Sequence, residues 1–579
     1  MHDLVIRNGR LVDGTGAAPQ DGMSIAVDGS VITAVGPDDS IAAGKREIDA
    51  SGLLVTPGFV DIHTHYDGQA TWDEELEPST PHGVTTLVMG NCGVGFAPAR
   101  PDDHQFLIEL MEGVEDIPGA ALSEGISWDW ESFPEYLDAL DRRQFTADVA
   151  ALIAHGPVRA YVMGERGAAN EPASSDEIAQ MAAIVQEAVE AGAMGFSTSR
   201  TIVHTALSGD PVPGTFAAED ELFGLGRAVK RAGRGLFEVA AAGVAGEDLD
   251  APRKEMDWIC RLAQEIERPV TWLLLQNAMA SEDWRELLQL SADAVAAGHQ
   301  VIPQVAGRPF GMLVGLSTRH RFKALPRFAP LLALSIEEQA AAMADPELRS
   351  GLIADAVDAV GKLGEADALS AYFAEAYHLY FPLGDPVDYE PPPERSLAAI
   401  AAAAGRDPIE EYYDQLLERD GHALMMMPLL GYADGNGDAL YEMLNHPAAV
   451  LGLADGGAHA NFICDASTPT WMLTHWARDR SRGPRMALES VVQKMTSDTA
   501  ALFEFTDRGR VEVGLRADLN IIDFENLQLR EPRLVADLPA GGTRLLQAAE
   551  GYVATIVAGE VTRENDAFTG ARPGRLVRS

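Results

Sequence analysis

The stretch VTPGFVDIHTH, residues 55–65, carries the strongest structural signal in the chain. Its apolar part leads into two histidines, His63 and His65, which are two positions apart. Side chains in a β-strand alternate between faces, so both imidazoles point one way while Ile62 and Thr64 point the other way. Two imidazoles that converge at the end of a strand form half of a metal site. The alternative is a pair of solvent-facing histidines after a turn, which the buried character of the preceding run disfavours.

Further apolar segments continue this pattern through the middle of the chain. They are residues 84–90, 148–155, 193–197, 235–239, 269–275, 300–305 and 449–455. Segments with helical spacing lie between them, and one begins at Ser174 with Glu177 three positions later, which is an N-cap signature. Together with the first stretch this makes eight strands separated by helices. The pattern predicts an α/β protein with a (β/α)8 barrel, the TIM-barrel fold.

Both ends of the chain differ from this middle. Residues 1–55 contain short apolar strands with Asn-Gly and Asp-Gly turns, and residues 514–523 and 552–559 have the same style. We therefore expect residues 1–55 and 505–579 to pair into one small β domain, with the barrel at 56–504. A large insertion, at about 310–440, separates strands seven and eight and is expected to cover the site.

Composition narrows the function classes. The net charge of −44, from 88 acidic and 44 basic side chains, argues against nucleic acid or an anionic membrane as the main partner. The start MHDLVIR lacks a signal-peptide pattern and no apolar run approaches the roughly 18 residues of a membrane span, so we expect a cytoplasmic protein. The three cysteines, at 92, 260 and 464, are too few and scattered for a disulfide framework.

Functional residues of a (β/α)8 enzyme lie at the carboxyl ends of its strands. Strand one gives His63 and His65, strand two ends at Cys92 and strand eight ends at Asp455. Two imidazoles, a thiolate and a carboxylate are acceptable zinc ligands, and a carboxylate beside a metal-bound water can move its proton. The alternatives are a small buried hydrophobe for Cys92 and a helix N-cap for Asp455.

Residues near these strand ends are candidates for substrate binding. His155 ends strand three and could donate to a substrate carbonyl, although a histidine satisfied by the backbone is an equal alternative. Arg159 and Arg308 could grip a substrate carboxylate, although a single arginine is more often part of a surface ion pair. Further pocket and supporting candidates are Tyr66, Asp67, Gln69, Trp72, Asn91 and His459.

Several motifs together resemble the amidohydrolase superfamily and, within it, the D-aminoacylase group. They are PGFVDIHTH at 57–65, GVTT at 83–86, GNCG at 90–93, AGAMGFSTS at 191–199, GR at 509–510 and GLRADL at 514–519. The resemblance covers nearly the whole chain. It implies a deformed (β/α)8 barrel, a β-sandwich built from both termini, a divalent metal and hydrolysis of an amide-type bond. It also implies that His63, His65, Cys92 and Asp455 contact the metal, with Asp455 as the acid/base.

The chain departs from that group at strands five and six. The group has a metal-binding histidine at the end of each, whereas this chain has EVAA at 238–241 and LLQN at 274–277. Strand four, residues 193–200, holds no lysine that could be carboxylated to bridge two metals. We therefore predict one divalent ion, zinc before manganese or iron, on His63, His65, Cys92 and Asp455. Glu238 and Gln276 are the candidates for a further ligand.

These observations lead to a functional hypothesis with two alternatives. The hypothesis is a metal-dependent hydrolase that cleaves the C–N bond of an N-acyl amino acid or a cyclic amide, with Asp455 as general acid/base. The same architecture also supports a lyase, decarboxylase or deaminase. A third reading is a protein that binds a small molecule without turnover. The partner in each case is a small molecule, and size and family resemblance lead us to expect a homo-oligomer.

Overall fold

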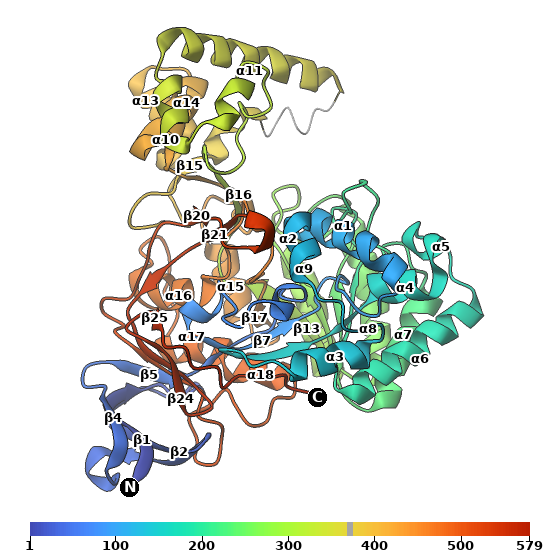
Figure 1. Cartoon of the computed structure of the whole chain (residues 1–579), viewed down its shortest axis with the longest axis vertical. Coiled ribbons are helices and arrows are strands. Elements are labelled where there is room, and N and C mark those ends of the chain that lie inside the picture. The colour runs from blue at the N-terminus through green and yellow to red at the C-terminus, as the bar shows by residue number, and fades with distance from the viewer. Residues whose placement is uncertain (367–373) are drawn as a thin grey trace.

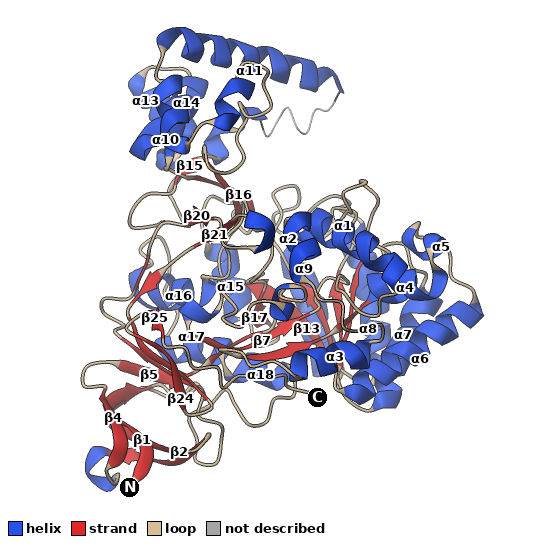
Figure 2. Ribbon diagram, viewed as in Figure 1, coloured by secondary structure: helices blue, strands red, loops and turns tan. Residues whose placement is uncertain are grey.

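The computed structural model of the chain describes residues 1–366 and 374–579. Parallel strands of the TIM-barrel type form its centre, and α6, α7 and α8 lie on their outer side (Figure 2). The central strands are β6 (Phe59–Asp61), β7 (Val84–Met89), β8 (Asp148–Ala151), β9 (Ile153–Ala154), β10 (Gly195–Ser199), β11 (Leu236–Ala240), β12 (Val270–Leu273), β13 (Val301–Ala306) and β17 (Val450–Gly452). Each segment predicted as a central strand overlaps one of them, and the third contains both β8 and β9.

The central strands pair in chain order. β6 pairs with β7 and β7 with β8, both in parallel. β8 continues as β9 after Leu152, and parallel pairing then runs from β9 through β10, β11, β12 and β13 to β17. A parallel bridge between Thr64 and Gly456 joins the segments that follow β6 and β17. The carboxyl ends of these strands therefore meet on one face, where residues from distant parts of the sequence come together.

The stretch 55–65 divides between two sheets. β5 (Leu54–Pro57) pairs antiparallel with β18 (Leu519–Ile522), whereas β6 pairs with β7. Gly58 separates β5 from β6, and a Cβ atom on it would lie 2.2 Å from the Thr85 hydroxyl oxygen. Only glycine fits this approach, since a contact that short cannot be relieved without moving β7. The stretch is thus two short strands, and both histidines follow the second.

The two ends of the chain form one nine-stranded sheet, in which β18 lies beside β5. Its order is β25-β24-β23-β18-β5-β1-β2-β3, with β4 on β1. The remaining bounds are β1 (His2–Leu11), β2 (Gln20–Asp28), β3 (Val31–Pro37), β4 (Gly44–Asp49), β23 (Tyr552–Val557), β24 (Glu560–Glu564) and β25 (Ala567–Phe568). Residues 54–57 and 519–522 thus lie side by side in one sheet. Two hairpin-like pairs follow β18 at the surface: β19 (Gln528–Leu529) with β22 (Ala549–Glu550), and β20 (Arg533–Val535) with β21 (Arg544–Leu546).

Helices follow most of the central strands. They are α1 (His104–Glu115), α2 (Gly119–Gly125), α3 (Phe133–Asp141), α4 (His155–Met163), α5 (Glu165–Ala168), α6 (Ser175–Ala191), α7 (Glu219–Ala232), α8 (Ala251–Ile266), α9 (Asp283–Ala296), α15 (Asp438–Asn445), α16 (Thr468–Trp471), a π-helix (Met472–Asp479), α17 (Leu488–Met495) and α18 (Ser497–Leu502). The N-cap predicted before α6 is present, because the Ser174 side chain accepts from the Glu177 N–H. Among the described residues, no helix combines the length and apolar character needed to cross a membrane.

The insertion between β13 and β17 has its own core. It begins with β14 (Phe310–Val314), which pairs with β16 (Met425–Leu430), and β16 also pairs with β15 (Phe381–Pro382). Its helices are α10 (Ile336–Met343), α11 (Pro346–Ala366), α13 (Leu397–Ala404) and α14 (Pro408–Leu417). Residues 367–373 of the predicted insertion lie outside the described residues. The helices pack around Phe322, Phe328 and Tyr413 and project from one end of the molecule, so mainly the base of the insertion contacts the barrel (Figure 1).

Candidate metal centre

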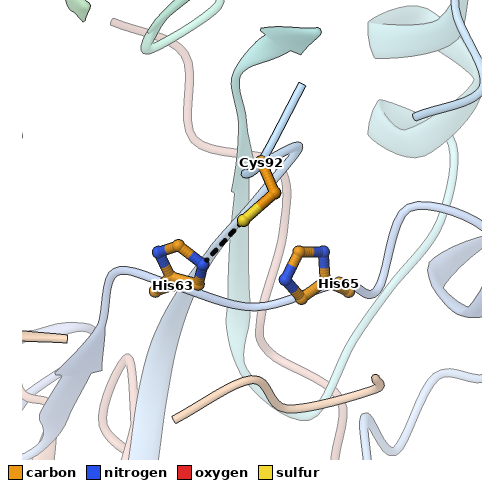
Figure 3. A group of neighbouring side chains, drawn as sticks. All are labelled: His63, His65 and Cys92. Carbon is orange, nitrogen blue, oxygen red and sulfur yellow. Dashed lines mark hydrogen bonds between the residues drawn. The ribbon is translucent and has the colours of Figure 1, made fainter. Parts of the chain in front are cut away.

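Three side chains converge at the carboxyl face of the barrel. One ligand atom each from His63, His65 and Cys92 lies within 4.8 Å of the other two, and all three side chains are buried (Figure 3). The Cys92 Sγ atom is 3.4 Å from His63 Nε2. A tetrahedral ion with ligands at about 2.0–2.3 Å has ligand atoms about 3.3–3.8 Å apart. The 3.4 Å separation of Cys92 and His63 lies in this range, and an ion would draw the set of three, now within 4.8 Å, slightly closer together. Nitrogen and sulfur ligands of this kind suit zinc.

Asp455 lies beside this cluster, just after β17. Its Oδ1 atom is 3.5 Å from His63 Nε2 and 3.8 Å from His65 Nε2. Oδ1 is buried and has no hydrogen-bond partner among the described residues. Burial raises the pKa of Asp455 well above its ordinary value, and the charges of Asp465 and Asp61 add to this. A cation between the carboxylate and the histidines would offset that cost, so the donor set fits a metal ion.

The orientation of His63 directs its Nε2 atom toward Cys92 and Asp455. Its Nδ1 atom is 3.0 Å from Gln304 Oε1 on β13, so the Nδ1–H donates to the amide oxygen in the neutral tautomer. Burial lowers the pKa of His63 to about 3, which keeps the ring neutral near pH 7. A metal-ligating histidine must be neutral, and a second hydrogen bond of this kind usually fixes its ring.

Glu238 on β11 approaches the cluster from strand five. Its Oε2 atom accepts from the Cys92 N–H at 3.1 Å, while Oε1 has no hydrogen-bond partner among the described residues. Burial raises the pKa of Glu238 to about 8. Burial, together with nearby carboxylates including Glu238, also raises the pKa of the Cys92 thiol, so a thiolate there needs a neighbouring cation. Glu238 as a further ligand stays a prediction.

Two residues that the sequence analysis did not select also belong to the centre. Glu115, the last residue of α1, has Oε1 3.3 Å from His65 Nδ1 and Oε2 3.9 Å from His459 Nε2. His204, after β10, has Nδ1 3.0 Å from the Ser199 hydroxyl, and burial lowers its pKa to about 4. It lies near enough to His63 and His65 that a charge on it would lower the pKa of both. The available signal for Glu115 was an acidic residue at the carboxyl end of an amphipathic helix, where the helix dipole disfavours negative charge.

His459 lies beside Asp455: its Nε2 atom is 3.8 Å from Asp455 Oδ2. Asp67 is buried near strand two, where its Oδ2 accepts from the Gly90 N–H at 3.1 Å and burial raises its pKa to about 7. Asn91 donates to the Thr64 and Val88 carbonyls and so supports the strand ends. Tyr66 donates to the Ser79 hydroxyl at 2.8 Å, which directs its polar atom away from the histidines.

Two predicted substrate contacts bind one buried carboxylate instead. His155 and Arg159, both on α4, share the buried carboxylate of Glu221: His155 Nε2 is 2.9 Å from Oε1, and Arg159 Nη1 is 2.7 Å from Oε1 and 2.8 Å from Oε2. His155 Nδ1 lies 2.8 Å from the Thr198 hydroxyl. These contacts use most of their hydrogen-bonding capacity, so substrate binding by either residue stays a prediction that the geometry disfavours.

Arg308 and Gln276 are likewise engaged elsewhere. Arg308 is buried, donates through Nε to Asp465 at 2.9 Å and lies 3.8 Å above the Tyr389 ring. Gln276 donates to Asp434 at 2.8 Å, which ties the end of strand six to the segment before α15. Gln69 donates to Asp73, and Trp72 packs close to Gly125 on α2. The predicted ligand role of Gln276 therefore has no geometric support in these contacts.

Comparison with known proteins yields consistent matches. The family model described as "Amidohydrolase family" matches residues 46–563. The D-aminoacylase of Alcaligenes xylosoxydans xylosoxydans is 27% identical over 593 aligned positions, covering 99% of this chain and 97% of that protein. The N-acyl-D-glutamate deacylase of the same organism is 33% identical over 255 residues, covering 44% of this chain and 46% of that protein. A crystal structure of D-aminoacylase superposes with a TM-score of 0.65 at 24% identity and covers 100% of both chains.

Proposed function

The chain belongs to the amidohydrolase family, and on that premise we propose that it hydrolyses the C–N bond of an N-acyl amino acid or a cyclic amide. The observation that carries the proposal is the buried convergence of His63, His65 and Cys92 beside the unpartnered Asp455 oxygen. The D-aminoacylase and N-acyl-D-glutamate deacylase relatives favour an N-acyl-D-amino acid as the substrate.

The proposed chemistry assigns a role to each of these side chains. A divalent ion, when bound, polarises a carbonyl oxygen and lowers the pKa of water. His63, His65 and Cys92 would hold that ion, and zinc is the ion that suits them best. Asp455 would accept a proton from the attacking water through Oδ1 as the new C–O bond forms. It would then deliver this proton to the nitrogen as the C–N bond breaks.

Metal analysis combined with two variants tests the proposal. We expect bound zinc, manganese or iron after metal-replete purification, and loss of turnover in His63→Ala and Asp455→Asn while the fold persists. The surface variant His422→Ala is the control, because His422 is exposed and pairs with Glu337 on the insertion. Absence of all three metals, or full activity of Asp455→Asn, would refute the assignment. Product masses separate hydrolysis, which adds water, from decarboxylation, which loses carbon dioxide, and from deamination, which releases ammonia.

The finer organisation is part of the same proposal. Residues 1–55 and 505–579 would form a β-sandwich, and residues 56–504 a deformed (β/α)8 barrel with the insertion at about 310–440. The shared sheet of both termini and the parallel pairing from β6 to β17 support this division. We further propose one zinc ion per chain, a homo-oligomeric assembly and a cytoplasmic location.

A further inference from the structure

One carboxylate reaches the metal centre from a helix rather than from a strand end. Glu115 ends α1, in the segment between β7 and β8, and its side chain is only about 3% exposed. Its Oε1 atom faces His65 Nδ1 at 3.3 Å, and neither atom has a hydrogen-bond partner among the described residues. A small rotation of the ring or the carboxylate would complete a hydrogen bond between them.

The two histidines of the centre are arranged alike. His63 has Gln304 at Nδ1 and directs Nε2 toward Asp455 Oδ1; His65 has Glu115 at Nδ1 and also directs Nε2 toward that oxygen. Metal-ligating histidines commonly donate their second N–H to a carboxylate or an amide oxygen, which fixes the tautomer and raises the basicity of the ligating nitrogen. Glu115 is placed to accept the Nδ1–H of His65, just as Gln304 accepts that of His63.

The position of Glu115 is itself fixed from two sides. The His459 N–H donates to the Glu115 carbonyl, which ties the end of α1 to the segment after β17. The next residue, Asp116, forms an ion pair with Arg319 at 2.6 Å and accepts from the Asn461 N–H at 3.4 Å. The backbone that carries the Glu115 carboxylate is therefore held in place before the metal binds, which limits where the side chain can lie.

A purely structural role does not account for this carboxylate. The carboxyl end of a helix disfavours negative charge, and burying an unpaired carboxylate is costly. Its two oxygens lie within 4 Å of the rings of His65 and His459. The burial is compensated if the His65 Nδ1–H donates to Glu115 while a cation lies on the other side of the ring.

We propose that Glu115 is a positioning residue that holds His65 for metal binding, so that the segment carrying α1 forms part of the metal centre. This inference rests on the proposed function, since it assumes an ion on His65 Nε2. Loss of the carboxylate would then weaken metal binding without removing a ligand. Losing a partner of this kind typically lowers metal affinity by about 10–100-fold.

Titration of the metal-free protein with Co²⁺, followed by its visible absorption and by competition with a chelator, tests the role without any substrate. We expect Glu115→Ala to lower Co²⁺ affinity by about 10–100-fold and to change the absorption bands, with a smaller effect in the isosteric Glu115→Gln. Glu109→Gln is the matched control, because Glu109 is an exposed carboxylate on the same helix α1 and its side chain accepts from Gln105; its affinity and spectrum should equal those of the wild type.

The outcomes separate the two proposals. If the wild type binds Co²⁺ and both Glu115 variants bind it equally well with the same spectrum, the role of Glu115 is overturned and the proposed function stands. If the wild type itself binds no Co²⁺, the proposed function is refuted, and the role of Glu115, which depends on it, is refuted as well. Thermal unfolding of each variant shows whether it folds. If Glu115→Ala does not fold, the isosteric Glu115→Gln still decides the question.

Discussion

At the level of single residues, the conformation of the turn that carries Cys92 depends on the two glycines around it. Cys92 has a φ of 56°, in the left-handed region, and lies between Gly90 and Gly93, which have φ values of 84° and 69°. A Cβ atom on Gly90 would lie 2.3 Å from the Leu152 carbonyl oxygen. Left-handed geometry costs a non-glycine residue about 1 kcal/mol or more and is frequent at functional sites. Asp455 shares the feature, with a φ of 46°.

Replacing Cys92 tests the thiolate directly. Cys92→Ser keeps the size of the side chain but substitutes a hydroxyl for a soft ligand, so we expect metal affinity to fall roughly tenfold or more. Metal per chain after dialysis against a chelator measures the loss. Cys464→Ser is the matched control, because Cys464 is also buried but its Sγ lies near the Leu545 carbonyl, at 3.8 Å. Equal retention of metal in the two variants would exclude Cys92 as a ligand.

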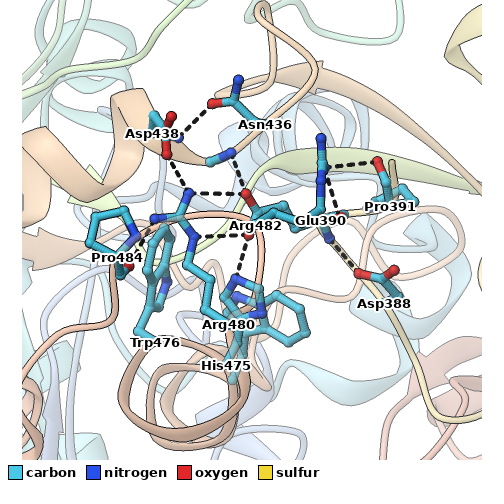
Figure 4. A network of polar contacts seen from close by, with 12 residues as sticks. Asp388, Glu390, Pro391, Asn436, Asp438, His475, Trp476, Arg480, Arg482 and Pro484 are labelled. Atoms are coloured by element: carbon cyan, nitrogen blue, oxygen red, sulfur yellow. Dashed lines mark hydrogen bonds and ion pairs between the residues drawn. The ribbon is translucent and has the colours of Figure 1, made fainter. Parts of the chain in front are cut away.

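At the level of helices and strands, a polar network joins Glu390, which lies between β15 and α13 of the insertion, to the π-helix Met472–Asp479 (Figure 4). Glu390 Oε2 accepts from His475 Nε2 at 2.7 Å and from Arg480 Nε at 3.0 Å. Arg480 also donates to Asp438 at the start of α15, at 2.6 Å. Because Glu390 and Arg480 are buried, the charge of each would be costly without the other as its partner. The network therefore fixes the segment before α13 against the barrel.

The pH dependence of stability follows from Glu390. Burial alone would raise the pKa of Glu390, but hydrogen bonds from His475, Arg480 and the Gly437 N–H outweigh it and lower the pKa from 4.5 to about 2. A carboxyl whose pKa is lower in the folded state stabilises the fold above its unfolded pKa and loses that contribution as pH falls. The free energy of unfolding should therefore decrease between about pH 4.5 and about pH 2.

Urea unfolding across this pH range measures the effect. Glu390→Gln should be less stable than the wild type at pH 6 and should show a flatter decrease on acidification. Glu394→Gln, which alters an exposed carboxylate in the same segment, should follow the wild type. Parallel pH profiles of Glu390→Gln and the wild type would contradict the assignment.

At the scale of the whole molecule, Asp148 joins three parts of the chain. It is fully buried on β8, and its oxygens accept from Arg508 Nη1 at 2.7 Å, from Arg516 Nη2 at 2.9 Å and from the Arg575 N–H at 2.9 Å. Arg508 and Arg516 lie just before β18 of the terminal sheet, and Arg575 belongs to the C-terminal tail. One carboxylate thus connects the central strands to the sheet that both chain ends build.

Removing that charge should destabilise the whole fold. Asp148→Asn leaves two buried guanidinium groups without their shared partner, so we expect the free energy of unfolding to fall by about 3–5 kcal/mol. Asp507→Asn is the control, because Asp507 also pairs with Arg508 but is half exposed, and such pairs contribute about 0–1 kcal/mol. Chemical denaturation of both variants gives the comparison, and a similar small change in each would contradict the role of Asp148.

Local pattern in the sequence determined where the central strands lie and which side chains stand at their ends. Strand periodicity, turn residues and the motif at 55–65 are properties of neighbouring residues, and parallel pairing brings strand ends together wherever the barrel forms. His63, His65, Cys92 and Asp455 could therefore be selected without coordinates. The division of 55–65 at Gly58 could not, because it depends on the close approach of Thr85.

Tertiary structure alone decided which partner each polar side chain meets. Glu115 reaches His65 only because α1 folds back over the strand ends, and the two residues are 50 positions apart. Arg159 turns to Glu221 and Arg308 to Asp465, since a buried guanidinium needs a carboxylate wherever packing offers one. Such contacts join residues whose separation in sequence carries no information about their distance. The sequence by itself placed the metal-binding groups at the strand ends, and packing decided what surrounds and orients them.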